Sequence, residues 1–201
     1  MATKSEIRQD IKVFKKETEG IMVDFAGEVI GYRIMAMEEY KEADTIFIYA
    51  DYNKEVKTGT IIEDALKLGK KVALPRVYNH DVAQDENKGR YMKFHYITSM
   101  NDVENGYNGI REPKETLPCA DYDTGNALMI MPMVAFDAER NRVGYGGGFY
   151  DKYLNSHSFK CKIGLAYDEQ KVESIDDKDE NDVRPDIIVT QKNIYNGFVK
   201  R

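Results

Sequence analysis

The chain has 201 residues, of which 42% are hydrophobic and 32% are charged, and its formal net charge is −6. A chain of this length buries a sizeable hydrophobic core, so we expect a single domain over residues 1–201. The acidic charge balance argues against a nucleic-acid binder, but it leaves room for an anionic small ligand in a locally basic cleft.

The opening segment and the cysteines bear on where the protein works. The sequence has no run of about eighteen apolar residues, so we expect no membrane span. The opening MATKSEIRQD lacks the apolar region of a secretory signal. Cys119 and Cys161 have no metal-like spacing, and we interpret them as reduced thiols. We therefore expect a cytoplasmic protein, and we expect it to be a monomer.

Two helices are predicted at the start of the chain. Thr3 stands three residues before Glu6, which is the spacing of a capping box, and Ile7, Ile11 and Phe14 then recur at helical spacing. A second stretch, rich in methionine and aliphatic residues, predicts a helix over roughly 21–40.

A strand, a helix and another strand follow. The apolar, β-branched run TIFIYA at 45–50 predicts a buried strand, and VALP within 71–75 predicts the next. Between them Thr58 is a candidate N-cap, and Gly69 is a usual helix stop. This βαβ pattern favours a parallel sheet.

The rest of the chain supplies further strands around two irregular stretches. Residues 78–90 are polar and predict a loop, and 100–125 predict an irregular excursion over the surface. Predicted strands cover 91–97, 127–132, 161–167 and 186–190, and a helix begins at about 149. We therefore predict an α/β fold: an open, mostly parallel sheet with helices on both faces, in a Rossmann-like three-layer arrangement.

Four glycines lie within RVGYGGGFYDKYL, at 144, 146, 147 and 148. Glycines let a backbone approach a ligand closely, and successive N–H groups before a helix N-terminus form an anion site. The pattern matches neither the P-loop nor the dinucleotide fingerprint, so a turn without a ligand stays open. Arg142 before the loop and Asp151 after it favour phosphate and Mg²⁺.

Other candidates surround this loop. Lys4 and Arg8 lie one turn apart beside the apolar stripe of the first helix, where they can reach a cleft or remain solvated. Glu55 follows a predicted strand at its carboxyl end, where open α/β sheets bind ligands. Tyr145, Phe149 and Tyr150 can stack on a flat heterocycle or pack in the core. No arrangement of histidines, cysteines or serines indicates a covalent nucleophile.

These motifs together resemble the 5-formyltetrahydrofolate cyclo-ligase family, also called 5,10-methenyltetrahydrofolate synthetase. The resemblance runs in order along nearly the whole chain. The matching stretches are KSEIR near the start, E-x-x-T-x-x-II at 55–62, VALPRV at 72–77, YMKFHYI at 91–97, GIREP at 109–113 and MPMVAFDAERNRVGYGGGFYDKYL at 131–154.

The resemblance implies a set of site residues. It implies ATP contacts at Lys4, Ser5, Arg8, Arg142, Gly144, Tyr145, Gly146, Gly147, Gly148, Phe149 and Tyr150. It implies folate contacts at Arg8, Ala50, Glu55, Tyr145, Gly146, Gly147, Gly148 and Phe149. It also implies catalytic roles for Arg142 and Tyr150 and Mg²⁺ contacts at Asp151 and Asp182. Some relatives carry basic residues at positions 145 and 147, so here the phosphate contacts must depend more on backbone N–H groups.

The implied activity is an ATP- and Mg²⁺-dependent cyclisation of 5-formyltetrahydrofolate to 5,10-methenyltetrahydrofolate, with ADP and phosphate released through an N5-iminium phosphate. The expected partners are thus two small molecules, ATP and a reduced folate. Two other functions stay open: a non-catalytic nucleotide- or folate-binding regulator, and a sugar-phosphate isomerase that needs no ATP.

Overall fold

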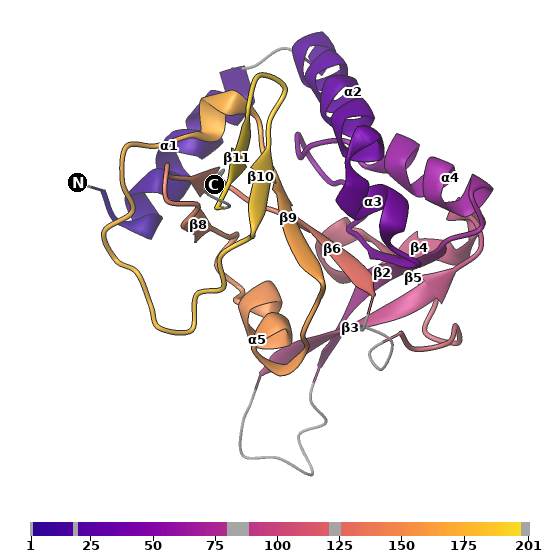
Figure 1. Cartoon of the computed structure of the whole chain (residues 1–201). Coiled ribbons are helices and arrows are strands. Elements are labelled where there is room, and N and C mark those ends of the chain that lie inside the picture. The colour runs from indigo at the N-terminus through magenta and orange to yellow at the C-terminus, as the bar shows by residue number, and fades with distance from the viewer. Residues whose placement is uncertain (1, 18–19, 80–88, 121–125, 198–201) are drawn as a thin grey trace.

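A computed structural model describes residues 2–17, 20–79, 89–120 and 126–197 of the chain (Figure 1). Its centre is a seven-stranded sheet of order β11-β10-β9-β6-β1-β2-β3. The five strands from β10 to β2 run parallel to their neighbours, and β3 and β11 are antiparallel edge strands. The strands are β1 Thr45–Phe47, β2 Lys71–Asn79, β3 Arg90–Ile97, β6 Ala127–Pro132, β9 Cys161–Leu165, β10 Ile187–Val189 and β11 Ile194–Asn196. The predicted open, mostly parallel sheet is confirmed.

Helices cover the sheet on both faces because its central strands are apolar on both sides. Ile46 and Ile48 of the first apolar run pack with the helices α2 and α4, whereas Phe47 between them packs with the opposite cluster under α5. The helices are α1 Lys4–Glu17, α2 Gly20–Ala36, α3 Glu38–Glu42, α4 Gly59–Lys67 and α5 Phe149–Ser156. The single helix predicted over 21–40 is wrong at one point, since the chain breaks at Met37, whose backbone is extended.

The first helix is anchored beside the site-forming loop. Its predicted capping box is confirmed: the backbone N–H of Thr3 donates to Oε2 of Glu6 at 2.8 Å, and the N–H of Glu6 donates to Oγ1 of Thr3 at 3.3 Å. Ile7 and Ile11 are buried against the hairpin of β7 (Ala135–Phe136) and β8 (Arg142–Val143). The side chain of Phe14 lies outside the described part. This packing brings the start of α1 next to the chain that leaves β8.

Thr58 has a different role from the predicted one. Its side chain makes no capping hydrogen bond to α4. Instead its buried hydroxyl donates to the carbonyl of Tyr49 at 2.7 Å, and its backbone N–H donates to Oδ1 of Asp51 at 3.0 Å. The prediction of a side-chain N-cap is therefore wrong. Thr58 holds the loop that follows β1 at the carboxyl edge of the sheet.

The segment expected to be irregular over 100–125 contains regular structure. Strands β4 (Val103–Asn105) and β5 (Arg111–Pro113) form a small antiparallel sheet joined through the 3₁₀ turn Tyr107–Gly109. Asn108 supplies the turn with a left-handed φ of 54°, which asparagine tolerates better than most residues. Residues 121–125, like 80–88 of the predicted loop at 78–90, lie outside the described part. Only the part of the prediction over 100–113 is thus corrected.

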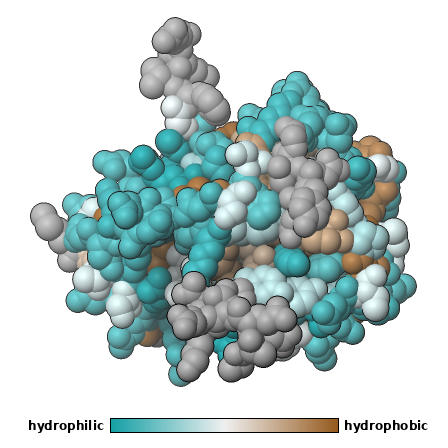
Figure 2. All heavy atoms as spheres, turned by 90° about the horizontal axis from the view of Figure 1, so that it is seen from below, coloured by the Kyte–Doolittle hydropathy of each residue, from teal (hydrophilic) through white to brown (hydrophobic). Residues whose placement is uncertain are grey.

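Hydrophilic side chains cover most of the molecular face shown in Figure 2, and apolar side chains form smaller patches between them. Within the described residues, none of the helices has the length and apolar character needed to cross a membrane.

Candidate active site

A cavity of about 380 Å³ lies at the carboxyl edge of the sheet, next to the ends of β1 and β6 and the outer half of β2. Open α/β sheets bind ligands at this edge, and the volume falls in the range of small-molecule sites. The predicted site residues that line it are Ala50, Glu55, Arg142, Gly144, Tyr145, Gly147, Gly148, Phe149, Tyr150 and Asp151. Predicted residues from two distant stretches of sequence, 50–55 and 142–151, therefore meet in one hollow.

The glycine loop forms one wall of the cavity, and at Gly144, Gly147 and Gly148 the backbone itself faces the cavity. Gly146 and Gly148 have φ values of 102° and 64°, which favour glycine. A Cβ on Gly147 would lie only 2.6 Å from the ring of Phe149. Helix α5 begins directly after Gly148, and the first N–H groups of a helix have no partners within it. The wall is thus suited to an anionic ligand.

Arg142 lies beneath this loop, paired with Asp151. Its residue surface is only 6% exposed, and its Nη2 donates to Oδ1 of Asp151 at 2.5 Å. Its Nε donates to the carbonyl of Val183 at 3.0 Å, and the N–H of Val183 donates back to Asp151 at 3.0 Å. Arg142 also lines a second cavity of about 290 Å³, on the side of the acidic segment 178–184. Arg142 therefore contributes to the lining of both cavities.

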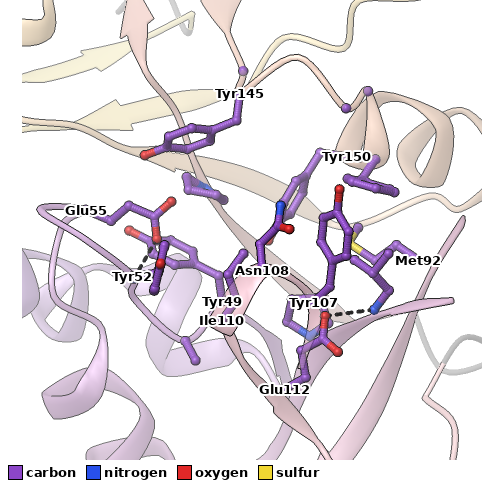
Figure 3. A pocket seen from close by; sticks show the side chains of 18 of the residues that line it. Tyr49, Tyr52, Glu55, Met92, Tyr107, Asn108, Ile110, Glu112, Tyr145 and Tyr150 are labelled. Atoms are coloured by element: carbon purple, nitrogen blue, oxygen red, sulfur yellow. Dashed lines mark hydrogen bonds between the residues drawn. The ribbon is translucent and has the colours of Figure 1, made fainter. Parts of the chain in front are cut away.

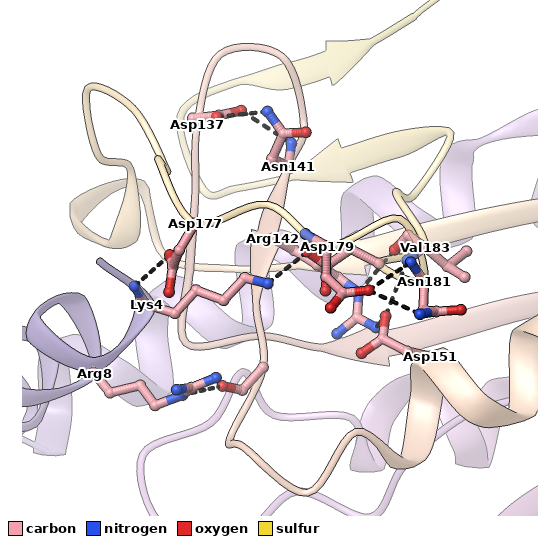
Figure 4. A network of polar contacts seen from close by, with 12 residues as sticks. Lys4, Arg8, Asp137, Asn141, Arg142, Asp151, Asp177, Asp179, Asn181 and Val183 are labelled. Carbon is pink, nitrogen blue, oxygen red and sulfur yellow. Dashed lines mark hydrogen bonds and ion pairs between the residues drawn. The ribbon is translucent and has the colours of Figure 1, made fainter. Parts of the chain in front are cut away.

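Two cations of α1 approach the loop from the other side (Figure 4). Nζ of Lys4 pairs with Oδ2 of Asp182 at 2.5 Å, and Nε of Arg8 donates to the carbonyl of Gly144 at 2.7 Å. The Arg8 guanidinium also lies beside Gly146. Ser5 is exposed on the same turn. Of the predicted site residues, five do not line the main cavity: Lys4, Ser5, Arg8, Gly146 and Asp182.

The two predicted metal ligands are neighbours through Val183. Asp151 accepts the N–H of Val183, the residue that follows Asp182. Among the described residues, no group of three histidine, cysteine or acidic side chains forms a metal cluster. Mg²⁺ commonly takes only one or two protein carboxylates and completes its shell with water and substrate phosphates. Asp151 and Asp182 are therefore candidates for such a shared site, and in this structure each pairs with a cation instead.

Acidic and phenolic groups gather at one end of the main cavity (Figure 3). Oε2 of Glu55 accepts the N–H of Tyr52 at 2.9 Å, which fixes the carboxylate at the cavity wall. Tyr145 reaches from the glycine loop toward Glu55, and burial together with this carboxylate raises the pKa of its phenol. Although 54% of Tyr145 remains exposed, its hydroxyl end points inward. This end of the cavity offers hydrogen-bonding partners to a polar ring.

Tyr150 places a buried hydroxyl at the cavity. Among the described residues, this hydroxyl has no hydrogen-bond partner. Burial raises the pKa of Tyr150, so its phenol stays protonated at neutral pH. A buried polar atom without a partner costs about 1–3 kcal/mol of folding free energy. Such an atom at a cavity wall is a donor available to a ligand.

The roof of the cavity was missed by sequence reasoning. It comes from the 3₁₀ turn and from β5, and it includes Tyr107, Asn108, Ile110 and Glu112. Glu112 is 3% exposed, and its Oε1 accepts the N–H of Val77 at 3.1 Å, which fastens β5 onto β2. The pair Asn-Gly at 108–109 predicts a tight turn, but no local pattern indicates that this turn folds back over a distant glycine loop.

Comparisons with known proteins show which family this chain is similar to. The sequence profile of the 5-formyltetrahydrofolate cyclo-ligase family matches residues 1–191. The 5-formyltetrahydrofolate cyclo-ligase of Escherichia coli K12 is 30% identical over 175 residues, which cover 84% of this chain and 90% of that protein. That of Haemophilus influenzae is 28% identical over 178 residues, which cover 86% and 89%. The structure of Aquifex aeolicus 5,10-methenyltetrahydrofolate synthetase aligns with a TM-score of 0.79 and 26% identity, covering 98% of this chain and 94% of that one.

Proposed function

The chain belongs to the 5-formyltetrahydrofolate cyclo-ligase family, and on that premise we propose that its main cavity joins ATP and 5-formyltetrahydrofolate for cyclisation. It is a ligase of folate one-carbon metabolism. One observation supports the site assignment most strongly. The backbone of the glycine loop, the carboxylate of Glu55 and the hydroxyl of Tyr150, which has no partner among the described residues, all line the same cavity.

The triphosphate of ATP lies against the glycine loop. Backbone N–H groups of 144–148 and the first turn of α5 bind its oxygens, as the positive end of a helix favours. Arg8 holds the loop through the carbonyl of Gly144, and Lys4, one turn earlier on α1, pairs with Asp182. These cations supply the basic surroundings that an acidic protein needs for an anionic ligand.

Asp151 and Asp182 would hold Mg²⁺ at this end of the nucleotide. Arg142 and Lys4 neutralise these carboxylates before the ligand arrives, at 2.5 Å each. The metal supplies charge neutralisation on the phosphoryl group during transfer. When the nucleotide binds, Arg142 and Lys4 would exchange these carboxylate partners for phosphate oxygens.

The pterin lies at the Glu55 end. Glu55 accepts hydrogen bonds from the N–H groups of the ring, and its position is fixed by the backbone of Tyr52. Ala50, Tyr145 and Phe149 line the space around it. This arrangement turns the N5-formyl group toward the glycine wall, where the γ-phosphate lies.

The chemistry needs orientation and charge stabilisation. The formyl oxygen attacks the γ-phosphorus and ADP leaves, which gives an N5-iminium phosphate. N10 then attacks the formyl carbon and loses its proton, and phosphate departs as the ring closes. The attacking formyl oxygen carries no proton, so the phosphoryl step requires no general base. The protein holds the two reactants in line. The hydroxyl of Tyr150 donates a hydrogen bond to the negative charge that develops during the phosphoryl transfer.

We extend the proposal to the setting of the enzyme: one domain over the whole chain, working as a monomer in the cytoplasm. Neither Cys119 nor Cys161 is part of a disulfide, which suits a reducing compartment.

An absorbance assay for the methenyl product tests the function. We expect product from 5-formyltetrahydrofolate only when both ATP and Mg²⁺ are present. Product without ATP, or no product with it, contradicts the proposal. Ligand binding without turnover would indicate the regulator considered above, and an ATP-independent sugar-phosphate isomerisation would indicate the isomerase.

A further inference from the structure

The β2–β3 hairpin extends the cavity wall outward from the sheet. Val77 pairs with Met92, and both line the cavity. The next residues on the same face are Asn79 and Arg90, which also pair with each other. Alternate side chains of a strand share a face, so Arg90 lies about 7 Å further along this wall than Met92. It therefore stands at the outer end of the cavity.

Arg90 is held in place there by neutral groups. Its Nη1 donates to the hydroxyl of Tyr107 at 2.8 Å, and its guanidinium carbon lies 4.6 Å from the centre of the Tyr107 ring. Its Nε donates to Oδ1 of Asn79 at 3.2 Å. Within the described part of the chain, Arg90 pairs with no carboxylate, whereas Arg76 of the same hairpin pairs with Glu104 at 2.8 Å. Arg90 is thus exposed and oriented, and no carboxylate of the described residues neutralises its charge.

The two sides of the cavity differ in chemistry. Figure 3 shows Glu55 and Tyr145 at one side and Met92 and Tyr107 at the other. A reduced folate is an elongated molecule, with its pterin at one end and a glutamyl tail that carries carboxylates at the other. If the pterin lies at Glu55, as proposed above, the tail leaves between Met92 and Tyr107.

We propose that Arg90, oriented by the ring and hydroxyl of Tyr107, binds the glutamyl carboxylates of the folate tail and sets the preference for substrates with such a tail. This inference rests on the proposed function. A guanidinium pairs with a carboxylate through two parallel hydrogen bonds. The cation–π contact keeps the guanidinium oriented without consuming its charge.

Binding measurements without ATP test this inference. The ligands are 5-formyltetrahydrofolate with one and with three glutamates, and a 5-formyl-tetrahydropterin that lacks the p-aminobenzoylglutamate. We expect Arg90→Gln to weaken both tailed ligands by about fivefold, as for an exposed ion pair, and to leave the tail-less pterin within twofold. Arg90→Lys keeps the charge but not the paired hydrogen bonds, so its loss should be smaller.

Arg33→Gln is the matched control. Arg33 lies on α2, away from the cavity, and donates to the backbone carbonyl of Lys192 at 3.3 Å. Its substitution by glutamine removes one positive charge, as Arg90→Gln does. It should leave all three affinities unchanged. Equal losses for tailed and tail-less ligands, or no loss for the tailed ones, overturn the role of Arg90 while the proposed function stands. Wild-type protein that binds none of the three ligands overturns the proposed function, and this inference with it.

Discussion

The guanidinium of Arg142 and the carboxylate of Asp151 are 2.5 Å apart where the main cavity meets the second one. The sequence indicated both residues as separate contacts, one to phosphate and one to Mg²⁺, whereas the structure shows them paired with each other. Arg142 is not a free cation waiting for phosphate, and Asp151 is not a free metal ligand. In this structure the two charges balance each other. Under our proposal, ATP with Mg²⁺ would separate them, because such a ligand carries charges of both signs.

This pairing predicts the behaviour of Asp151→Asn. The change removes a metal ligand and leaves the buried Arg142 without its counter-charge, so we expect stability to fall by about 2 kcal/mol. The KM for Mg–ATP should rise at least about tenfold. Steady-state kinetics at varied Mg²⁺ and chemical denaturation measure the two effects. Asp186→Asn is the control, because Asp186 pairs with Lys162 at 2.9 Å away from the main cavity. An unchanged Mg²⁺ dependence in Asp151→Asn would remove this residue from the metal site.

The closeness of Gly147 to Phe149 predicts a sharp difference between two alanine substitutions. In Gly147→Ala the new Cβ meets the Phe149 ring at 2.6 Å, so the loop must shift. We expect a loss of about 1–3 kcal/mol in stability and a large loss of ATP affinity, measured by calorimetry with a non-hydrolysable analogue. Gly59→Ala is the control, since nothing lies within 4 Å of its Cβ position. Normal nucleotide affinity in Gly147→Ala would show that the loop geometry is not needed.

The unpartnered hydroxyl of Tyr150 predicts an opposite response of stability and activity. Tyr150→Phe removes a buried donor that has no described partner, so stability should stay constant or rise by up to about 1 kcal/mol. At the same time kcat should fall, because the donor to the developing charge is lost.

Tyr40→Phe provides the comparison for Tyr150. The hydroxyl of Tyr40 donates to Oδ2 of Asp64 at 2.7 Å, away from the cavity. This variant should lose about 1 kcal/mol and keep full activity. Thermal unfolding and kcat measured side by side distinguish the two tyrosines. A Tyr150→Phe enzyme with wild-type kcat would leave Tyr150 as a packing residue only.

Glu112 predicts a pH dependence of stability. Burial raises the pKa of this carboxyl above its ordinary value of 4.5, although the hydrogen bonds that it accepts from backbone N–H groups lower the pKa in part. The folded protein therefore binds a proton more tightly than the unfolded chain. The contribution of Glu112 is fully present below about pH 4.5 and is lost as pH rises through the raised pKa. Glu112→Gln should thus gain stability relative to wild type between about pH 4.5 and 7, as measured by denaturant unfolding at several pH values. A difference that stays constant over that range would contradict the raised pKa.

The sequence was informative where one local pattern determines a structure. The apolar, β-branched run TIFIYA predicted a buried strand, and the spacing of Thr3 and Glu6 predicted the helix start, because each depends on neighbours within a few residues. The glycine loop could be located for the same reason. Gly146 and Gly148 have positive φ values, and this local conformation favours glycine, so the sequence itself marks the loop.

The rest depends on contacts between distant parts of the chain. Thr58 has the sequence of an N-cap, yet its hydroxyl is drawn to the carbonyl of Tyr49 by the folding of the loop after β1. The roof over 107–112 is held by Glu112 on the backbone of β2, 35 residues away. The pairing of Lys4 with Asp182 spans 178 residues. No periodicity or spacing encodes such pairs, so the resemblance to a family could indicate the residues but not their partners.

The most direct test of the central claim is a crystal structure of the complex with a non-hydrolysable ATP analogue, Mg²⁺ and 5-formyltetrahydrofolate. We expect the terminal phosphate on the backbone of 144–148, the metal at Asp151 and Asp182, and the pterin against Glu55. A nucleotide bound elsewhere, with the glycine wall bare and Arg142 still paired with Asp151, would contradict the account.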